Sequence, residues 1–161
     1  MKFEIIKGDL IQKALSGEFD VIAHGCNCFC VQGAGIALAM NEAFSTLKFM
    51  SEHINFRGSV FKLGNIEYEG KYRNSPRASH PHPRMEGYDY FVVNAYIQYQ
   101  PGRNLDYEAL TLCMRKLNYE FKGKHIGLPW IGCGIAGGNK TRVEQILRTE
   151  LKDCNVTICE L

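Results

Sequence analysis

The sequence lacks any apolar stretch of about 18 residues, and its first residues, MKFEIIKGDL, lack the apolar run of a signal peptide. We therefore expect neither a membrane-spanning helix nor secretion. Strong charge is absent as well, because the formal net charge is only +2 and no basic stripe with interleaved aromatic residues occurs. General nucleic-acid binding is not expected, although a mildly basic chain can bind a small anionic ligand.

Paired metal-ligand spacings are also missing, although the chain holds seven cysteines. Their number is odd and most of them have apolar neighbours, which favours a reduced, cytoplasmic protein over a disulfide framework. Cys26, Cys28 and Cys30 alternate along the chain, but this is not the CxxC spacing of a zinc site, and no second pair follows. We expect no metal and no cofactor.

No internal repeat and no linker divides the 161 residues, of which 45% are hydrophobic and 22% charged. This composition predicts a single domain over residues 1–161, long enough to bury its own core. Residues 71–88 are rich in Pro, Gly, Ser and Arg and predict a loop insertion. Within it, His80 and His82 fit a solvated turn better than a metal site, because no further ligand lies at a useful spacing.

Short apolar or alternating runs predict strands, and they alternate with segments of helical periodicity. We expect strands at Phe3–Lys7, Val21–Ala23, Lys62–Tyr68, Phe91–Tyr96, His125–Pro129 and Val156–Glu160. We expect helices at Leu10–Leu15, from Ile36 through Phe44, around Leu105 to Leu117, and at Thr141–Leu151. This alternation predicts a three-layer α/β/α sandwich with a central mixed, mostly parallel sheet.

Two glycine-rich loops each leave a predicted strand and enter a predicted helix. The first contains Gly33, Ala34, Gly35 and Ile36, and the second contains Gly132, Cys133, Gly134, Ile135, Ala136 and Gly137. Ligands of such sheets bind beyond the carboxyl ends of the strands, so both loops are expected at one edge. Free amides at a helix start favour an anion there, and glycine lets the backbone approach a phosphate. One such loop is typical of a tight turn, whereas two together fit a pyrophosphate.

The second loop also contains a complete G-x-G-x-x-G, which makes a dinucleotide-binding Rossmann domain the main alternative. That fingerprint normally opens its domain, whereas here only about 24 residues follow it. The Rossmann fold needs further strands after this unit, and it leaves the first loop unexplained.

Four motifs in this order resemble the macrodomain family, and they span nearly the whole chain. They are GDL at 8–10, VIAHGCN at 21–27, GAGIA at 33–37 and PWIGCGIAGG at 129–138. The His-Gly-Cys-Asn-Cys variant resembles the subgroup of ADP-ribose 1''-phosphate phosphatases. The resemblance implies a macrodomain-like monomer that binds ADP-ribose or ADP-ribose 1''-phosphate, and hydrolyses the latter to ADP-ribose and phosphate.

The same resemblance implies roles for single residues. Asp9, followed by Leu10, would accept a hydrogen bond from the adenine amino group, although Asp9 could instead, or also, cap the following helix. Asn27 would bind the terminal ribose, with a turn residue as the alternative. The backbones of 33–36 and 132–137 would hold the phosphates.

Asn27 and His24 are the two candidate catalytic residues. His24 would bind the 1''-phosphate or transfer a proton, with a structural, hydrogen-bonded histidine as the alternative. Phosphatase signatures are absent, since no cysteine is followed six residues later by an arginine and no Asp-x-Asp occurs. Hydrolysis would therefore depend on a positioned water, substrate strain and electrostatic stabilisation at the loops.

Several positions depart from the family pattern. Ala136 stands where relatives that cleave ADP-ribose from glutamate have an aspartate, and where many binders have an aromatic residue. Asn139 and Lys140 replace an expected Asp-Trp pair, and Cys159 replaces a frequent tyrosine. These changes are expected to lower affinity or slow turnover. The alternative function is an ADP-ribose reader or an ADP-ribosyl hydrolase acting on modified macromolecules.

Overall fold

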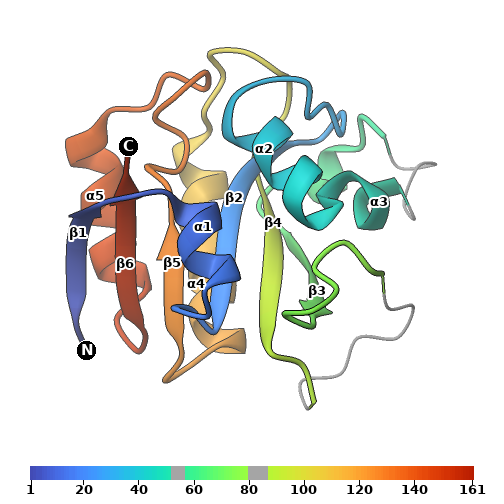
Figure 1. The fold of residues 1–161 in the computed structure, drawn as a ribbon. Coiled ribbons are helices and arrows are strands. Elements are labelled where there is room, and N and C mark those ends of the chain that lie inside the picture. Colours follow the sequence, from blue (N-terminus) through green and yellow to red (C-terminus); the bar gives the residue numbers. More distant parts are fainter. Residues whose placement is uncertain (52–56, 80–86) are drawn as a thin grey trace.

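The computed structural model describes residues 1–51, 57–79 and 87–161 (Figure 1). Within these ranges six strands form one sheet in the order β1-β6-β5-β2-β4-β3. The strands are β1 (Phe3–Lys7), β2 (Val21–Asn27), β3 (Ile66–Lys71), β4 (Tyr90–Gln98), β5 (His125–Leu128) and β6 (Asn155–Glu160). Only β3 runs antiparallel to its neighbour, so the predicted mixed, mostly parallel sheet is confirmed.

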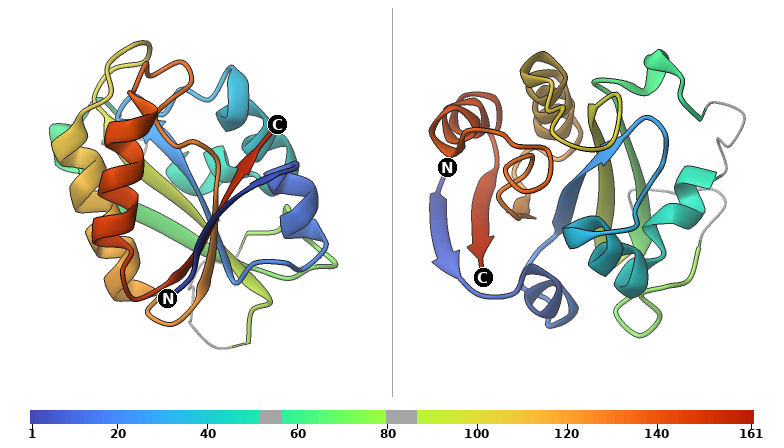
Figure 2. Two further views of the ribbon diagram at one scale, coloured as in Figure 1. Left: turned by 90° about the vertical axis from the view of Figure 1, so that its left-hand side faces the viewer. Right: turned by 90° about the horizontal axis from the view of Figure 1, so that it is seen from above.

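Helices cover both faces of this sheet, and Figure 2 shows the three layers edge-on. They are α1 (Leu10–Leu15), α2 (Gly35–Phe44), α3 (Thr46–Ser51), α4 (Tyr107–Glu120) and α5 (Lys140–Glu150). α4 and α5 lie on one face, and α1, α2 and α3 lie on the other. The predicted α/β/α sandwich is confirmed. Among the described residues, no helix is long and apolar enough to cross a membrane.

Strand β2 shows why the central strands are apolar along their whole length. Val21 and Ala23 pack into the core beneath α4 and α5, whereas Ile22 packs into the core beneath α1 and α2. Successive side chains of a strand point to opposite faces, and here each face is covered by helices. The sequence of a strand that is buried on both faces is therefore apolar at successive positions, without alternation between apolar and polar residues.

Segment boundaries differ from the sequence prediction in the region before β4. Residues Val60–Lys62 form a 3₁₀ turn that the Ser59 hydroxyl caps, and Gly64 turns the chain at φ +80°. The strand predicted to begin at Lys62 therefore begins at Ile66. Lys71, the first residue of the predicted insertion, still pairs with Tyr90 as part of β3. His80 and His82 lie outside the described residues.

Helix α3 (Thr46–Ser51) was not predicted, since its short sequence, TLKFMS, contains no helical period to recognise. It follows α2 through Ser45, which adopts a left-handed conformation at φ 56°. The Leu47 amide is bonded to the Asn41 side chain at 2.9 Å, which fixes the start of α3 against the end of α2.

Candidate functional site

The two glycine loops face each other across a cavity of about 510 Å³. The first loop connects β2 to α2, and the second connects β5 to α5. The wall includes residues 33–37 of the first loop, 129–136 of the second, and Gly25, Cys26, Asn27, Val31, Ile97, Gln98, Pro101, Gly102 and Lys140. A Cβ at Gly35 would lie 3.5 Å from Cδ1 of Ile135, which shows how closely the loops approach. Of the predicted loop residues, only Gly137 is not part of this wall.

Helix α2 begins at the cavity, with Gly35 as its first residue. Its N-cap, Ala34, makes no side-chain capping bond. The first amides of a helix have no partner inside the helix, so those of α2 remain available as donors toward the cavity. Together with the positive end of the helix dipole, they favour an anion at this wall.

The second loop owes its shape to glycines that adopt left-handed backbone angles. Gly132 has φ +74° and Gly137 has φ +76°, a region that other residues rarely occupy. Gly134 is exposed, and a Cβ at this position would meet no atom within 4 Å. The loop therefore presents bare backbone to the cavity, which suits close approach of a phosphate.

A second cavity of about 490 Å³ adjoins the first. Its wall contains Asp9 and Leu10, and it shares Gly35, Ile36, Pro129, Trp130 and Lys140 with the wall of the loop cavity. We call the first space the loop cavity, the second the Asp9 cavity, and both together the groove. The groove thus offers a carboxylate at one end and two sets of backbone amides at the other.

Asp9 does cap helix α1. Its Oδ1 accepts hydrogen bonds from the amides of Ile11 and Gln12 at 2.9 and 3.1 Å. Among the described residues, no hydrogen bond reaches Oδ2. The capping alternative and a ligand-binding role are therefore compatible, because one carboxylate oxygen serves the helix while the other is left for the cavity.

Asn27 lies at the carboxyl end of β2 with only 8% of its surface exposed. Its Oδ1 accepts from the amides of Phe29 and Val31 at 3.1 and 3.2 Å, and its Nδ2 donates to the Val31 carbonyl at 3.0 Å. Asn27 is therefore a turn residue that also borders the loop cavity. One Nδ2 hydrogen remains for a ligand, since a primary amide has two donors.

The structure does not bring His24 into the groove. Its side chain is fully buried, and its Nε2 lies 2.6 Å from Oδ1 of Asn94. Because the Asn94 amide nitrogen donates to the Thr46 carbonyl, the Asn94 oxygen faces His24 and the histidine must carry its proton on Nε2. Burial lowers the pKa of His24 to about 4. This placement favours the structural alternative, and the catalytic role stays a prediction.

No protein-family profile matches the chain. An uncharacterized 17.5 kDa protein from the tk-vs intergenic region of Enterobacteria phage T4 is 35% identical over 164 residues, which cover 99% of this chain and 97% of the phage protein. This chain belongs to the same family as that phage protein.

Solved structures identify the fold. The macrodomain of Thermus aquaticus DarG superimposes with a TM-score of 0.74 at 18% identity, covering 99% of this chain and 98% of that one. The fold is that of a macrodomain. Thermosipho africanus DarTG in complex with ADP-ribose gives a TM-score of 0.76 at 13% identity, with 99% of this chain matching 41% of the longer one.

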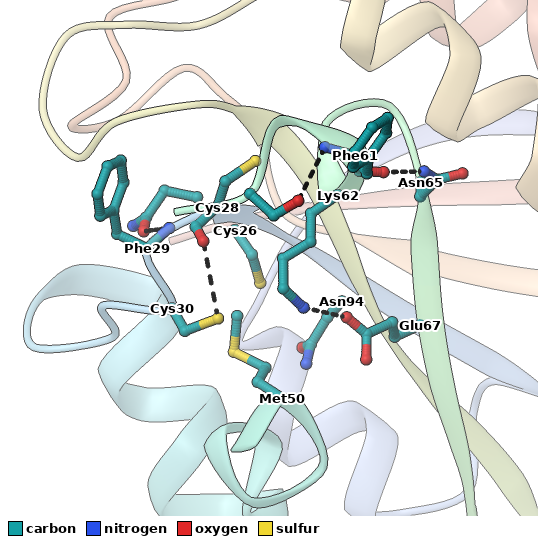
Figure 3. A network of polar contacts seen from close by, with 12 residues as sticks. Cys26, Cys28, Phe29, Cys30, Met50, Phe61, Lys62, Asn65, Glu67 and Asn94 are labelled. Carbon is teal, nitrogen blue, oxygen red and sulfur yellow. Dashed lines mark hydrogen bonds and ion pairs between the residues drawn. The ribbon is translucent and has the colours of Figure 1, made fainter. Parts of the chain in front are cut away.

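A sulfur-rich cluster supports the first glycine loop from behind (Figure 3). Cys26, Cys28 and Cys30 form a small buried core with Tyr96 and with Met50 of α3. Burial raises the pKa of Cys26, and that of Cys28 to about 11, so both stay protonated thiols. No group of three or more metal-ligating side chains occurs in the part of the chain that the structure describes.

Gln32 ties the first loop to that cluster. Its Nε2 donates to Sδ of Met50 at 2.8 Å, and its Oε1 accepts from the Thr46 hydroxyl at 2.7 Å. Its neighbours Val31 and Gly33 are exposed and border the loop cavity. The loop is thus anchored on one side by Asn27 and on the other by Gln32, which keeps its backbone in a defined position.

Trp130 and Lys140 are among the groove residues that were not predicted as site residues. Trp130 donates its indole N–H to Oε1 of Glu160 at 2.6 Å, and Nζ of Lys140 lies 5.4 Å from the centre of the indole ring. The Trp130 hydrogen bond, together with Lys7, lowers the pKa of Glu160. The sequence shows Trp130 and Lys140 near the second loop, but only the fold places them where the two cavities meet.

Proposed function

We propose that this macrodomain binds ADP-ribose in the groove. Adenosine would occupy the Asp9 cavity, the pyrophosphate would lie between the two glycine loops, and the terminal ribose would contact Asn27. The observation that carries the proposal is the continuous groove, with an acceptor carboxylate in one cavity and available amides in the other. Two solved structures with this fold, Thermosipho africanus DarTG and a Trypanosoma brucei macrodomain, are complexes with ADP-ribose.

The narrower proposal, hydrolysis of ADP-ribose 1''-phosphate, has to operate without a suitable acid or base. Among the described residues, the ionisable side chains of the loop cavity are Cys26, Cys133 and Lys140. Burial raises the pKa of both cysteines, so neither supplies a thiolate near neutral pH. Any turnover would rely on a positioned water that attacks the phosphorus while the bond to the 1''-oxygen breaks and that oxygen leaves as the ribose hydroxyl, with the loop amides stabilising the charge on the transferred phosphoryl group.

The lack of a suitable acid or base among the described residues of the loop cavity supports the reader as the alternative function. A binding site needs the carboxylate, the amides and the shape of the groove, but no proton-transfer group. The lysine–aspartate mechanism of glutamate-linked ADP-ribose cleavage has no counterpart here, because Ala136 stands in the position of the aspartate. Reader and phosphatase share the same binding step and differ only in the chemistry that follows it.

Two measurements on the wild-type protein test these proposals. Calorimetric titration should give micromolar or tighter binding of ADP-ribose, and at least about tenfold weaker binding of NAD⁺, equivalent to about 1.4 kcal/mol. Equal or tighter binding of NAD⁺ would instead support the dinucleotide alternative. Release of inorganic phosphate from ADP-ribose 1''-phosphate would support the phosphatase, whereas binding without release would support the reader.

A further inference from the structure

Lys140 occupies the junction of the groove, because it borders both the loop cavity and the Asp9 cavity. Its ammonium lies over the ring of Trp130, 5.4 Å from the ring centre. Trp130 is itself held by Glu160, whose other carboxylate oxygen lies 3.3 Å from Nζ of Lys7. The contact with the Trp130 ring therefore fixes the position of the Lys140 ammonium at the groove.

The position of Lys140 in its helix is unfavourable for a cation. It is the first residue of α5, where the helix dipole is positive, and the first turn holds no acidic residue. Among the described residues, its ammonium forms no ion pair. Glu160 is near enough for the Lys140 charge to lower its pKa, but its two carboxylate oxygens already contact Trp130 and Lys7, whereas an anionic ligand in the groove would pair directly with the ammonium.

We propose that Lys140 is a specificity residue that recognises the diphosphate of the ligand. The proposal rests on the proposed function, in which the ligand runs from the Asp9 cavity into the loop cavity. The two cavities share the helix start at Gly35 and Ile36 on one side and Lys140 on the other, so a diphosphate crossing the junction passes between backbone amides and an ammonium. The amides supply fixed dipoles, and Lys140 adds a full charge.

The consequence is selection by charge. Ligands that carry a diphosphate gain from Lys140, whereas adenosine, which would fill only the Asp9 cavity, does not. Because the ammonium is at the surface, its contribution falls as salt screens the charge. Affinity for ADP-ribose should therefore depend on ionic strength through this one side chain.

Arg142 provides a matched control in the same turn of the same helix. Its guanidinium stacks on the ring of Tyr107, 3.7 Å from the ring centre, in a hollow between α4 and α5. Arg142 is not part of the groove wall. Arg142→Gln removes the same charge from the same end of α5 as Lys140→Gln, but on another side of the helix.

The test is titration of wild type, Lys140→Gln, Lys140→Arg and Arg142→Gln with ADP-ribose and adenosine at low and high salt. Lys140→Gln should weaken ADP-ribose binding about tenfold, at the low end for a hydrogen bond to a charged group, and should flatten its salt dependence. Lys140→Arg should restore most of the affinity. Adenosine binding should be unchanged in Lys140→Gln, and ADP-ribose binding should be unchanged in Arg142→Gln.

Thermal unfolding separates recognition from a structural role. Because Lys140 opposes the helix dipole, Lys140→Gln should not lower the melting temperature although it lowers the affinity. Wild-type affinity in Lys140→Gln, or an equal loss in Arg142→Gln, would overturn the specificity role while leaving ADP-ribose binding intact. Absence of ADP-ribose binding by the wild type would instead overturn the proposed function.

Discussion

Asp9 carries two separable interactions, and substitutions can remove them one at a time. Its Oδ1 accepts from the Ile11 and Gln12 amides at the start of α1, whereas Oδ2 is left for the groove. Asp9→Ala removes both interactions. Asp9→Ser keeps a good N-cap, because a serine hydroxyl accepts the same kind of bond, but it is too short to reach a ligand.

The two variants should therefore differ in stability and agree in affinity. Loss of the cap in Asp9→Ala should cost about 1 kcal/mol of unfolding free energy, whereas Asp9→Ser should stay within a few tenths of the wild type. Both should weaken ADP-ribose binding by about 1.5–3 kcal/mol, the range for a hydrogen bond to a charged group. Chemical denaturation reports the first quantity and calorimetric titration the second.

Asp9→Ser decides between the roles. If Asp9→Ser binds ADP-ribose as tightly as the wild type, Asp9 is only a helix cap and the adenine assignment is wrong. If Asp9→Ala loses affinity while Asp9→Ser retains it, the loss arises from a frayed α1 rather than from a missing ligand contact.

Three further predictions concern the walls of the groove and the core behind them. The folded protein holds the pKa of His24 at about 4, against 6.5 for a free histidine, so the free energy of unfolding should fall by about 3 kcal/mol as the pH drops from about 6.5 towards 4. In acid denaturation, His24→Gln should remove most of this decline, and the variant should bind ADP-ribose normally at pH 7. Asn27→Ala breaks three hydrogen bonds to the first loop and should weaken ADP-ribose binding at least about tenfold. Urea unfolding should show a loss of about 1–3 kcal/mol in unfolding free energy. Wild-type affinity in this variant would show that the loop does not need Asn27 as an anchor. Gly132→Ala should lower the unfolding free energy by about 1–3 kcal/mol, because φ is +74° and the new Cβ would lie 2.9 Å from Leu105, whereas Gly33→Ala, whose Cβ meets no atom within 4 Å, should remain stable under the same conditions.

Local signals in the sequence were sufficient for most of the fold. The alternating residues of Phe3–Lys7 and the apolar run in β4 identified their strands, and Gly17 correctly ended the helix after Leu15. The weak points were short segments without periodicity. Helix α3 is held by the bond from Asn94 to the Thr46 carbonyl, and the chain after the 3₁₀ turn is held by the bond from the Gly64 amide to the Tyr96 carbonyl. A local sequence pattern does not contain such contacts with distant residues.

The candidate site was predictable where it consists of backbone and unpredictable where it consists of side-chain neighbours. Glycine at a strand–helix junction signals exposed amides at any position in the chain, so both loops were found. Trp130, Lys140 and Glu160 meet only because β5, α5 and β6 pack together. No spacing in the sequence encodes that meeting, and the junction of the groove was therefore missed as a site.

His24 and Asn27 show where the information in the sequence ends and that of the tertiary structure begins. The sequence placed both at the end of β2, and it could determine no more than that. In the core, His24 bonds to Asn94 of the neighbouring β4, whose amide in turn donates to the Thr46 carbonyl at the start of α3, whereas Asn27, which follows the irregular pairing after Cys26, borders the groove. Successive side chains of a strand point to opposite faces of the sheet, but only the packing of the helices decides which positions are buried in the core and which are open to a ligand.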